Sequence, residues 1–400
     1  MKQHLIIDNG AYTIKAGYST SSRPTKVQNS ISKTRDGLIH IGNSYISHTN
    51  SYVGLISKRP YDQGHLTSWE TEKPIWDYTF DQISDQELEF SSMKLTLTES
   101  AFQLPQLSIN TDQIVFEEYG FDEYYRCIPA SLVPWSLDMS KMNGDFTLVI
   151  DSGFSATWIV PVIYQSVYWK GVRKLPIGGK LLNGLLKEII SFRHYDISDD
   201  PILVNTIKES TFFLAENFND TLRNKLEHSC DFILPDFKTT TTGYVKTKDM
   251  QLSADTQVLT LSDERFSIPE SYFHPEIVFD NTSLVQSSPF KNITDLIVES
   301  IMACPEITRP LLSANIVLVG GCTNIPNFKT RLQSELRREL FQEWKVHVNE
   351  FENPDEVSWK SGVELASEVD IWKEISVKKK EYFEHGANWC QKRFGFDTIV

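Results

Sequence analysis

Two stretches of the chain share one pattern of apolar and polar positions. Residues 5–18 (LIIDNGAYTIKAGY) and residues 146–161 (FTLVIDSGFSATWIVP) each begin with a run of strand-forming residues that ends in an aspartate. A small or polar residue, a glycine and a second apolar run follow in both stretches. This pattern predicts two β-hairpins with small-residue turns, in which Asp8 and Asp151 hold equivalent positions.

A glycine pair precedes a helical pattern after the second hairpin. Leucines and isoleucines recur at helical spacing in residues 181–190 and predict an amphipathic helix. A helix that begins behind Gly178 and Gly179 would point its free N–H groups at an anion. Core packing accounts for the leucines but leaves the double glycine unexplained.

Another glycine pair follows the buried strand predicted at residues 314–319 (ANIVLV), and a second helical pattern covers residues 328–340. The order of strand, glycine turn and helix is typical of sites where the backbone comes close to a ligand. Here that turn holds Gly320 and Gly321.

The other segments carry weaker patterns. Residues 19–54, rich in Ser, Thr and Asn, predict a small exposed β-loop subdomain, and residues 67–80 predict an amphipathic helix. Residues 124–137 favour a helix that is interrupted by Pro129. Residues 219–260 are the least regular and predict a surface excursion with little order.

Length, composition and charge narrow the class of protein. Four hundred residues are two to three times a common domain length, so two lobes with a cleft between them are expected. With 40% hydrophobic residues the chain can bury a sizeable core. The formal net charge of −14 argues against a surface that grips nucleic acid by itself, but it does not exclude basic protein partners such as histones.

The ends of the chain and its cysteines bear on the compartment. The five cysteines are odd in number and widely spaced, without a Cys-x-x-Cys motif, which favours a reducing, intracellular environment. The N-terminus leads directly into a predicted strand, and no window approaches a membrane-spanning length. We expect a nuclear or cytosolic protein without a membrane partner.

The two hairpins together indicate a phosphate site. A small-residue turn leaves backbone N–H groups free to face an anion, and an aspartate at the strand end can hold a metal through water. Two such hairpins that face each other would hold a nucleotide's phosphates between two lobes. A single Asp-x-Gly turn is weaker, because it more often belongs to an unrelated hairpin.

Eight motifs occur in the order of one known family. They are DNGAYTIKAGY, SYVG with KRPYDQG, WETEKPIWDYTF, VFE, VIDSGFSATWIVP, IKE, ANIVLVGGCTNIP, and SWKSG with EYFEHG. Through them the chain resembles actin and the actin-related proteins over nearly its whole length. The resemblance implies an α/β fold of the actin type, shared with sugar kinases and the Hsp70 ATPase domain, with two lobes, four subdomains and a nucleotide cleft between the lobes.

The resemblance also implies boundaries and site residues. The first lobe would span residues 1–140 with a small β-loop subdomain at about 29–65, and the second 141–340 with its surface excursion at about 219–260. Residues 341–400 would be C-terminal helices that pack back on the first lobe. ATP, with Mg²⁺, would be the cofactor, with the metal at Asp8 and Asp151. The implied contacts to phosphate, metal, ribose or base are Asp8, Asn9, Gly10, Ala11, Lys15, Asp151, Gly153, Gly179, Lys208, Glu209, Gly320, Gly321 and Thr323.

Departures from the family pattern concern catalysis. The positions at which actin orients and activates the attacking water are similar in place to Pro129, Trp158 and Phe154, and none of these side chains can accept a proton. Ala11 stands where actin senses the terminal phosphate, Tyr12 follows it in place of a turn glycine, and Asp355 stands where a basic residue lies near the adenine. No catalytic residue is therefore expected: the chain would bind ATP without efficient hydrolysis, or bind it weakly.

Among divergent members the chain most resembles a nuclear subfamily found in Swr-type chromatin remodellers, which exchange histones for a variant. That resemblance implies three kinds of partner: the insert region of the remodeller ATPase subunit, a small zinc-finger subunit of the HIT type, and histones or the nucleosome. It implies a nuclear location with some cytoplasmic protein. The loop at 29–52 and the segment 219–260 depart from actin's filament surfaces, so we expect no filaments.

Two other functions stay open at this point. One is a cytoskeletal, filament-forming ATPase of the actin type, against which the replaced catalytic positions count. The other is a sugar kinase or chaperone ATPase on the same fold, against which the motifs SWKSG and EYFEHG count.

Overall fold

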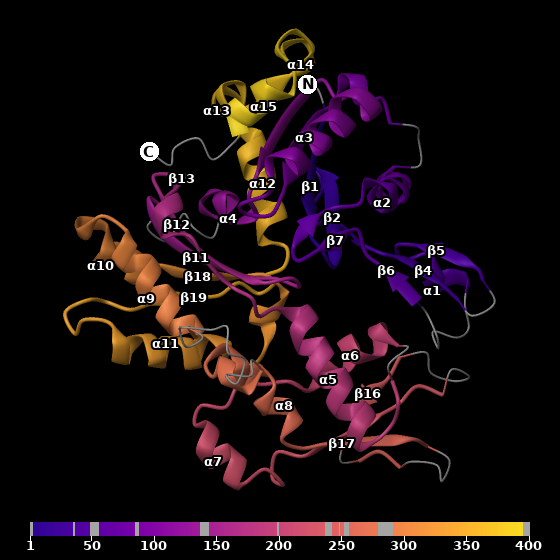
Figure 1. Cartoon of the computed structure of the whole chain (residues 1–400), viewed down its shortest axis with the longest axis vertical. Coiled ribbons are helices and arrows are strands. Elements are labelled where there is room, and N and C mark those ends of the chain that lie inside the picture. The colour runs from indigo at the N-terminus through magenta and orange to yellow at the C-terminus, as the bar shows by residue number, and fades with distance from the viewer. Residues whose placement is uncertain are drawn as a thin grey trace, which may run out of the picture.

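The computed structural model has two lobes, each built on its own mixed β-sheet (Figure 1). It describes residues 3–34, 37–48, 56–84, 88–136, 144–197, 200–236, 242–247, 249–251, 256–278 and 291–394. The motif SYVG at residues 51–54 lies outside these ranges, as does part of the loop at 29–52.

The first lobe contains a six-stranded sheet in the order β20-β10-β9-β1-β2-β3. Its strands are β1 (His4–Asn9), β2 (Thr13–Tyr18), β3 (Thr25–Gln28), β9 (Lys94–Thr98), β10 (Glu123–Cys127) and β20 (Val377–Lys378). All of β1 is buried because both faces of the strand are covered. Leu5 and Ile7 pack with Trp76 and Phe116, whereas a Cβ on Gly362 would lie 2.8 Å from Ile6, so the helix that carries Gly362 packs closely on the opposite face.

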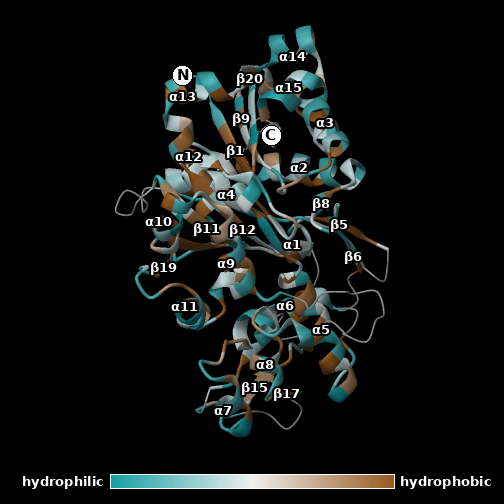
Figure 2. Ribbon diagram, turned by 60° about the vertical axis from the view of Figure 1, so that its left-hand side comes forward, coloured by the Kyte–Doolittle hydropathy of each residue, from teal (hydrophilic) through white to brown (hydrophobic). Residues whose placement is uncertain are grey.

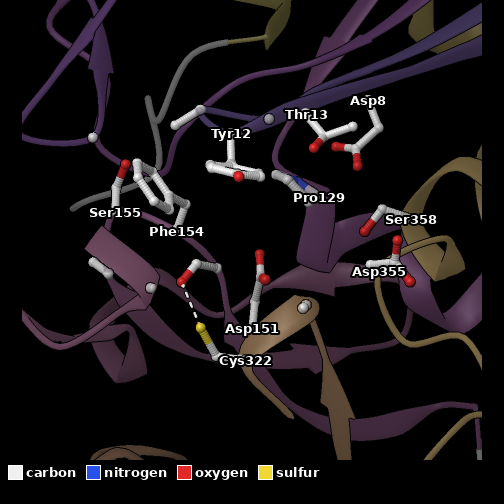
Figure 3. A pocket seen from close by; sticks show the side chains of 18 of the residues that line it. Asp8, Tyr12, Thr13, Pro129, Asp151, Phe154, Ser155, Cys322, Asp355 and Ser358 are labelled. Carbon is white, nitrogen blue, oxygen red and sulfur yellow. Dashed lines mark hydrogen bonds between the residues drawn. The ribbon is translucent and has the colours of Figure 1, made fainter. Parts of the chain in front are cut away.

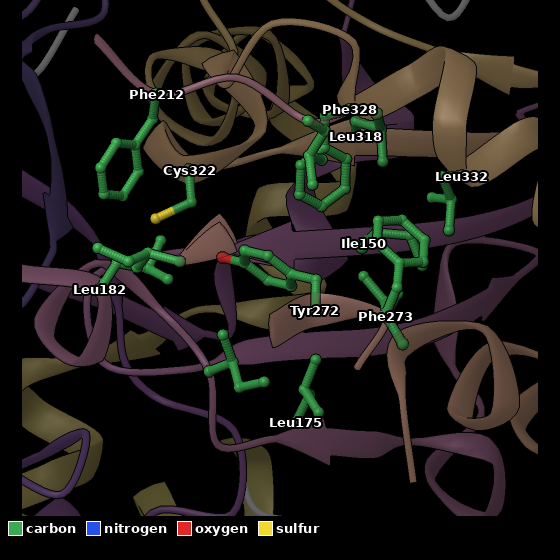
Figure 4. Close-up of a cluster of buried hydrophobic side chains, with 14 of the residues drawn as sticks. Ile150, Leu175, Leu182, Phe212, Tyr272, Phe273, Leu318, Cys322, Phe328 and Leu332 are labelled. Atoms are coloured by element: carbon green, nitrogen blue, oxygen red, sulfur yellow. The ribbon is translucent and has the colours of Figure 1, made fainter. Parts of the chain in front are cut away.

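The second lobe repeats this connectivity in the order β13-β12-β11-β18-β19, with β14 paired to β12. The strands are β11 (Phe146–Ser152), β12 (Thr157–Ile163), β13 (Ser166–Val167), β14 (Arg173–Leu175), β18 (Ile316–Val319) and β19 (Val348–Asn349). β11 runs antiparallel to β12 and parallel to β18, as β1 does to β2 and β9. Ile150 of β11 and Leu318 of β18 are fully buried in one cluster with Tyr272 and Phe328 (Figure 4).

Helices cover the two sheets and supply their apolar partners. They are α1 (Tyr45–His48), α2 (Trp69–Ile83), α3 (Pro105–Gln113), α4 (Pro129–Leu132), α5 (Gly179–Arg193), α6 (Pro201–Thr211), α7 (Phe218–Arg223), α8 (Glu264–Ser267), α9 (Ile293–Ala303), α10 (Arg309–Ser313), α11 (Phe328–Glu339), α12 (Val357–Ser367), α13 (Val369–Ile375), α14 (Lys379–His385) and α15 (Ala387–Phe394). A π-helical turn (Ile114–Tyr119) extends α3. In Figure 2 hydrophobic residues concentrate in the strands of the two sheets, whereas the outer helix α14 is mainly hydrophilic.

Local sequence explains where several helices begin. In α9, Asn292 and Asp295 form a capping box, with the Asn292 side chain 2.9 Å from the Asp295 amide. In α6, the Asp200 side chain accepts from the Leu203 amide at 3.0 Å, and Pro201 occupies the first turn. The C-terminal helices contact the first lobe, where the Tyr382 ring stacks on Phe116 at 4.6 Å between centroids. The lobe boundaries near residues 140 and 340 remain predictions.

Two regions differ from the sequence-based expectation. Residues 123–127 form strand β10 where the pattern favoured a helix. Arg126 is buried in this strand, where its guanidinium pairs with Asp112 at 3.0 Å and with Glu99. Only the short α4 follows, beginning at Pro129.

In the segment 219–260, the described residues 219–236, 242–247, 249–251 and 256–260 are more regular than expected, and the other residues of the segment lie outside the described ranges. β15 (Cys230–Ile233), β16 (Tyr244–Val245) and β17 (Val258–Leu261) form a small sheet, and Phe232 and Leu259 are fully buried in the core of the second lobe. Strands of two to four residues are too short for periodicity to distinguish them from loops, which is why these strands were not predictable.

The small β-loop subdomain of the first lobe contains a sheet in the order β5-β4-β6, formed by β4 (Ile31–Lys33), β5 (Ile39–Ile41) and β6 (Ile56–Lys58). A tight pair, β7 (Tyr61–Asp62) and β8 (His65–Leu66), leads back toward the cleft. No helix in the described part of the chain is long and apolar enough to cross a membrane.

Candidate functional site

A cavity of about 750 Å³ lies between the two hairpins, and every predicted site residue except Thr323 lines it. This volume is within the range of natural small-molecule sites. Figure 3 shows Asp8 and Asp151 on the two sides of this space, one from each lobe. Thr323 lies behind the wall and supports it, because its hydroxyl donates to the carbonyl of Gly320 at 2.7 Å.

The first hairpin presents an aspartate whose oxygens are both engaged. Asp8 lies at the end of β1 opposite Lys15 of β2, and the ammonium nitrogen is 3.0 Å from Asp8 Oδ2. The hydroxyl of Thr98 donates to Asp8 Oδ1 at 2.8 Å and accepts from the Asn9 amide at 3.0 Å. The carboxylate is therefore fixed in direction and neutralised before any ligand is considered.

The second hairpin presents an aspartate without such support. Asp151 occupies the equivalent position on β11, but the residue opposite it on β12 is Trp158. No hydrogen bond or ion pair to the Asp151 carboxylate occurs among the described residues. Its removal from water, and next the negative charge of Asp8, raise the pKa of Asp151 to about 7, while Lys15 opposes this shift.

These two carboxylates fit a hydrated divalent cation. The described residues contain no group of three or more His, Cys, Asp and Glu side chains that could hold a metal ion by themselves. Mg²⁺ commonly keeps several waters and is bound by one or two carboxylates together with phosphate oxygens. The unpartnered charge of Asp151 is the feature that such a cation would satisfy.

The turn after β18 offers close backbone contact. Gly320 adopts φ 91°, and a Cβ at this position would lie 2.4 Å from the carbonyl oxygen of Ser152. Only glycine is compatible with both the left-handed backbone and this approach. Gly321, next in the chain, has open space around its Cα and lines the cavity.

On the second lobe, α6 contributes a polar cluster to the wall. The Lys208 ammonium donates to Asn205 Oδ1 at 2.7 Å, and Asn205 in turn donates to Glu209 Oε1 at 2.8 Å. Lys208 is buried, whereas Glu209 is exposed. The amide of Asn205 thus holds an acidic and a basic side chain side by side, an arrangement suited to ribose hydroxyls.

The start of α5 does not offer its first N–H groups to a ligand, which corrects the sequence-based expectation. The amides of Gly179 and Lys180 donate to the carbonyls of Gly153 and Phe154 at 3.1 and 2.8 Å. A Cβ on Gly178 would lie 2.8 Å from three backbone atoms of the same turn. The double glycine is therefore explained by close packing of the second hairpin turn on this helix.

The three residues that the resemblance places at actin's water-activating positions all face the same cavity. Pro129, Phe154 and Trp158 line it, and none of them has a side-chain acceptor. The Trp158 ring has the Lys174 ammonium 5.1 Å from its centroid. Asp355 also lines the cavity, but its carboxylate is 2.7 Å from the Lys26 ammonium.

Several residues that organise the site were not predicted from the sequence. Glu72 of α2 is fully buried, accepts from Trp76 at 3.2 Å and from Asn29 at 3.3 Å, and burial raises its pKa to about 7. Trp76 also donates to Asn9 Oδ1 at 3.2 Å. Of the residues that were not predicted, Thr98 could have been found most easily from the sequence. It ends a period-two strand pattern next to the first hairpin.

Comparison with known proteins identifies the family. The family model described as Actin matches residues 1–395. Actin-like protein ARP6 of Debaryomyces hansenii is 63% identical, with 100% of both chains covered, and that of Candida albicans is 58% identical, with 99% of both covered. Actin-like protein ARP6 of Saccharomyces cerevisiae is 37% identical, again with 99% of both covered.

These comparisons confirm the expected α/β fold of the actin type and the resemblance to actin-related protein 6, the subfamily indicated by the sequence. By the match of its whole length and by the similarity of its full-length relatives, the chain belongs to the actin family.

Proposed function

We propose that this protein is an actin-related structural subunit of a nuclear Swr-type chromatin-remodelling complex, which exchanges histones for a variant, and that it binds ATP without efficient hydrolysis or binds it weakly. Support comes from the full-length similarity to proteins named Actin-like protein ARP6. The complex and its chemistry are carried over from the resemblance to the nuclear subfamily.

One observation carries the nucleotide part of the proposal. The cavity keeps the two aspartates and Lys15 of a phosphate and metal site, while the side chains at the water-activating positions are Pro129, Phe154 and Trp158. When bound, Mg²⁺ would supply positive charge between the carboxylates and the phosphate oxygens. Loss of one well-placed polar group costs about 10²- to 10³-fold in rate, and here several are missing together.

Nucleotide content and turnover test this part. The purified protein is denatured, the released small molecules are separated by chromatography, and phosphate release from added ATP is measured in parallel. We expect an adenine nucleotide in the released fraction, or weak binding on addition, with phosphate release far below that of conventional actin. A rate of phosphate release like that of actin would refute the proposal of inefficient hydrolysis. It would favour the alternative that the protein is a filament-forming ATPase.

The proposed partners are the insert region of the remodeller ATPase subunit, a small zinc-finger subunit of the HIT type, and histones or the nucleosome. We further propose a nuclear location with some cytoplasmic protein, and no filaments. Tagging the protein and identifying what co-purifies tests this assembly. A chain recovered alone, or one that pellets as a polymer with salt and ATP, would count against it.

The small β-loop subdomain is the first surface to test for a partner. Ile39 and Ile56 lie on either side of Lys33 in its sheet and are 67% and 73% exposed. Exposed apolar groups that gather on one surface are often interaction sites. Serine at both positions is expected to weaken co-purification, whereas Ile307→Ser, at an 80% exposed isoleucine of the second lobe, serves as the matched control.

A further inference from the structure

Two aromatic rings, one from each hairpin turn, meet across the cleft. The ring centroids of Tyr12 and Phe154 are 4.8 Å apart at an interplanar angle of 44°. Both residues line the cavity, and Figure 3 shows their rings side by side in the space between the hairpins. The two lobes are thus in direct contact at the point where their turns approach each other.

Arg59 covers this ring pair from outside the cavity. Its guanidinium carbon lies 4.3 Å from the Tyr12 ring centroid and 5.1 Å from that of Phe154, yet Arg59 is not among the residues that line the cavity. Arg59 Nη1 donates to the carbonyls of Tyr12 at 3.0 Å and Asn29 at 3.1 Å. The two rings therefore lie between the Arg59 guanidinium and the cavity.

A second set of contacts closes the same side of the cleft. The Lys174 ammonium of the second lobe donates to the carbonyl of Gln63 at 3.4 Å. Next to it, a Cβ on Gly64 would lie only 3.4 Å from Cβ of Ser155 in the second hairpin turn. The β7–β8 turn thus continues the cross-lobe contact that the rings begin.

The backbone at both ends of the ring pair is anchored. The carbonyl of Tyr12 accepts from the Asn29 amide at 2.8 Å, and the carbonyl of Phe154 accepts from the Lys180 amide at 2.8 Å. Movement of either turn by itself would break these bonds. The ring contact can therefore open by rotation of the side chains or by separation of the lobes.

We propose that Tyr12, Phe154 and Arg59 form an aromatic gate, which must open before a nucleotide enters or leaves the cavity. This inference rests on the proposed nucleotide binding and adds how that site is regulated. A gate that must open for both entry and exit slows both rates and leaves the equilibrium affinity largely unchanged.

Rapid-mixing kinetics with fluorescent ADP and ATP analogues test the gate. In Tyr12→Ala and in Phe154→Ala, the association and dissociation rate constants should both rise about tenfold, while Kd changes less than about threefold. A tenfold change corresponds to about 1.4 kcal/mol, which lies within the range of aromatic and cation–π contacts. The rate constants of the double variant should not be much higher than those of either single variant, because each substitution removes the same contact.

Controls separate the gate from other roles of the rings. Tyr12→Phe keeps the ring contact and should retain wild-type rates, as should Phe192→Ala, which removes a 91% exposed ring on α5. Melting temperatures measured for every variant show which of them are folded, and either alanine variant alone suffices for the test.

The outcomes distinguish this inference from the function on which it rests. A faster dissociation with an unchanged association rate would mean that the rings merely contact the nucleotide, and would overturn the gate. Rates unchanged in both alanine variants would overturn it as well, while nucleotide binding stands. If neither the wild type nor the alanine variants bind any nucleotide, the proposed nucleotide binding itself is wrong, and the gate with it.

Discussion

The two hairpins share their topology and turn length but differ in how they treat an equivalent aspartate. Asp8 faces Lys15 across its hairpin and receives a hydrogen bond from Thr98. Asp151 faces Trp158, and its pKa is raised to about 7. The first hairpin thus supplies a counter-ion for its own aspartate and is in this sense electrostatically complete, whereas the Asp151 carboxylate has no hydrogen bond or ion pair among the described residues.

The two aspartates therefore differ in what each does in the ligand-free chain. The pair of Asp8 and Lys15 is formed without any ligand, so breaking it should destabilise the fold. Ionisation of Asp151 lowers the stability of the ligand-free chain, because burial and the charge of Asp8 oppose it. The three predictions below examine this contrast, beginning with the largest effect.

Removal of the first hairpin's cation should have the largest effect on stability. Lys15→Met leaves the Asp8 carboxylate, of which only 8% is exposed, without its counter-ion. Because breaking a buried pair leaves an uncompensated charge, we expect a loss of about 2–3 kcal/mol in the free energy of unfolding. Urea denaturation monitored by circular dichroism measures this loss.

A double variant separates the missing charge from other effects of this substitution. Asp8→Asn together with Lys15→Met removes both charges and should recover most of the lost stability. If Lys15→Met alone costs less than about 0.5 kcal/mol, as an exposed pair would, the first hairpin is not electrostatically complete and the contrast fails.

Neutralising the second aspartate should have a smaller effect of opposite sign. The pKa of Asp151 is about 7 in the folded chain against a reference value of 3.8. The unfolded chain therefore loses this proton first, and the wild type loses stability as the pH rises from about 4 to about 7. Above that range Asp151→Asn should be more stable by about 1–2 kcal/mol, allowing for partial solvent access.

The measurement is the difference in unfolding free energy between Asp151→Asn and the wild type at pH 5, 6.5 and 8. It should grow with pH, and Asp8→Asn, which leaves Lys15 unpaired, should lose stability instead. The Asp151 variant should also lose any increase in nucleotide affinity caused by Mg²⁺. A variant less stable than the wild type at pH 8 would show that Asp151 has a favourable partner in the empty chain.

The sequence predicts the elements of this site better than the contacts between them. Both hairpins follow from local patterns, because an aspartate, a small residue and a glycine between two apolar runs specify a turn without reference to the rest of the chain. The glycine turn at Gly320 follows for the same reason. All of these lie on the cavity wall.

Contacts between distant segments were beyond such patterns. The first amides of α5 donate to the carbonyls of Gly153 and Phe154. These carbonyls belong to a turn that precedes the helix by more than twenty residues. Arg126 likewise pairs with Asp112 and Glu99, which lie 14 and 27 residues away along the chain. Periodicity reports which face of an element is apolar, but not which distant polar group will satisfy a buried one.

The smallest effect is expected from making the second hairpin resemble the first. Trp158→Lys places an ammonium opposite Asp151, in the register position that Lys15 holds opposite Asp8. The new charge should lower the pKa of Asp151, so the stability penalty that wild type acquires between about pH 4 and pH 7 should shrink. The gain is offset because the ring contact with Phe102, 6.1 Å between centroids, is lost and the new ammonium lies near Lys174.

The net change in stability should therefore stay within about 1 kcal/mol, and the informative quantity is its slope with pH. Between pH 6 and pH 8 the unfolding free energy of Trp158→Lys should vary less than that of the wild type, whereas Trp158→Leu, which removes the ring without adding a charge, should keep the wild-type slope. This comparison distinguishes the effect of a cation opposite Asp151 from the effect of losing the Trp158 ring. If the lysine and leucine variants share one slope, the residue opposite the aspartate does not control its ionisation, and the contrast between the two hairpins must arise from Thr98 instead.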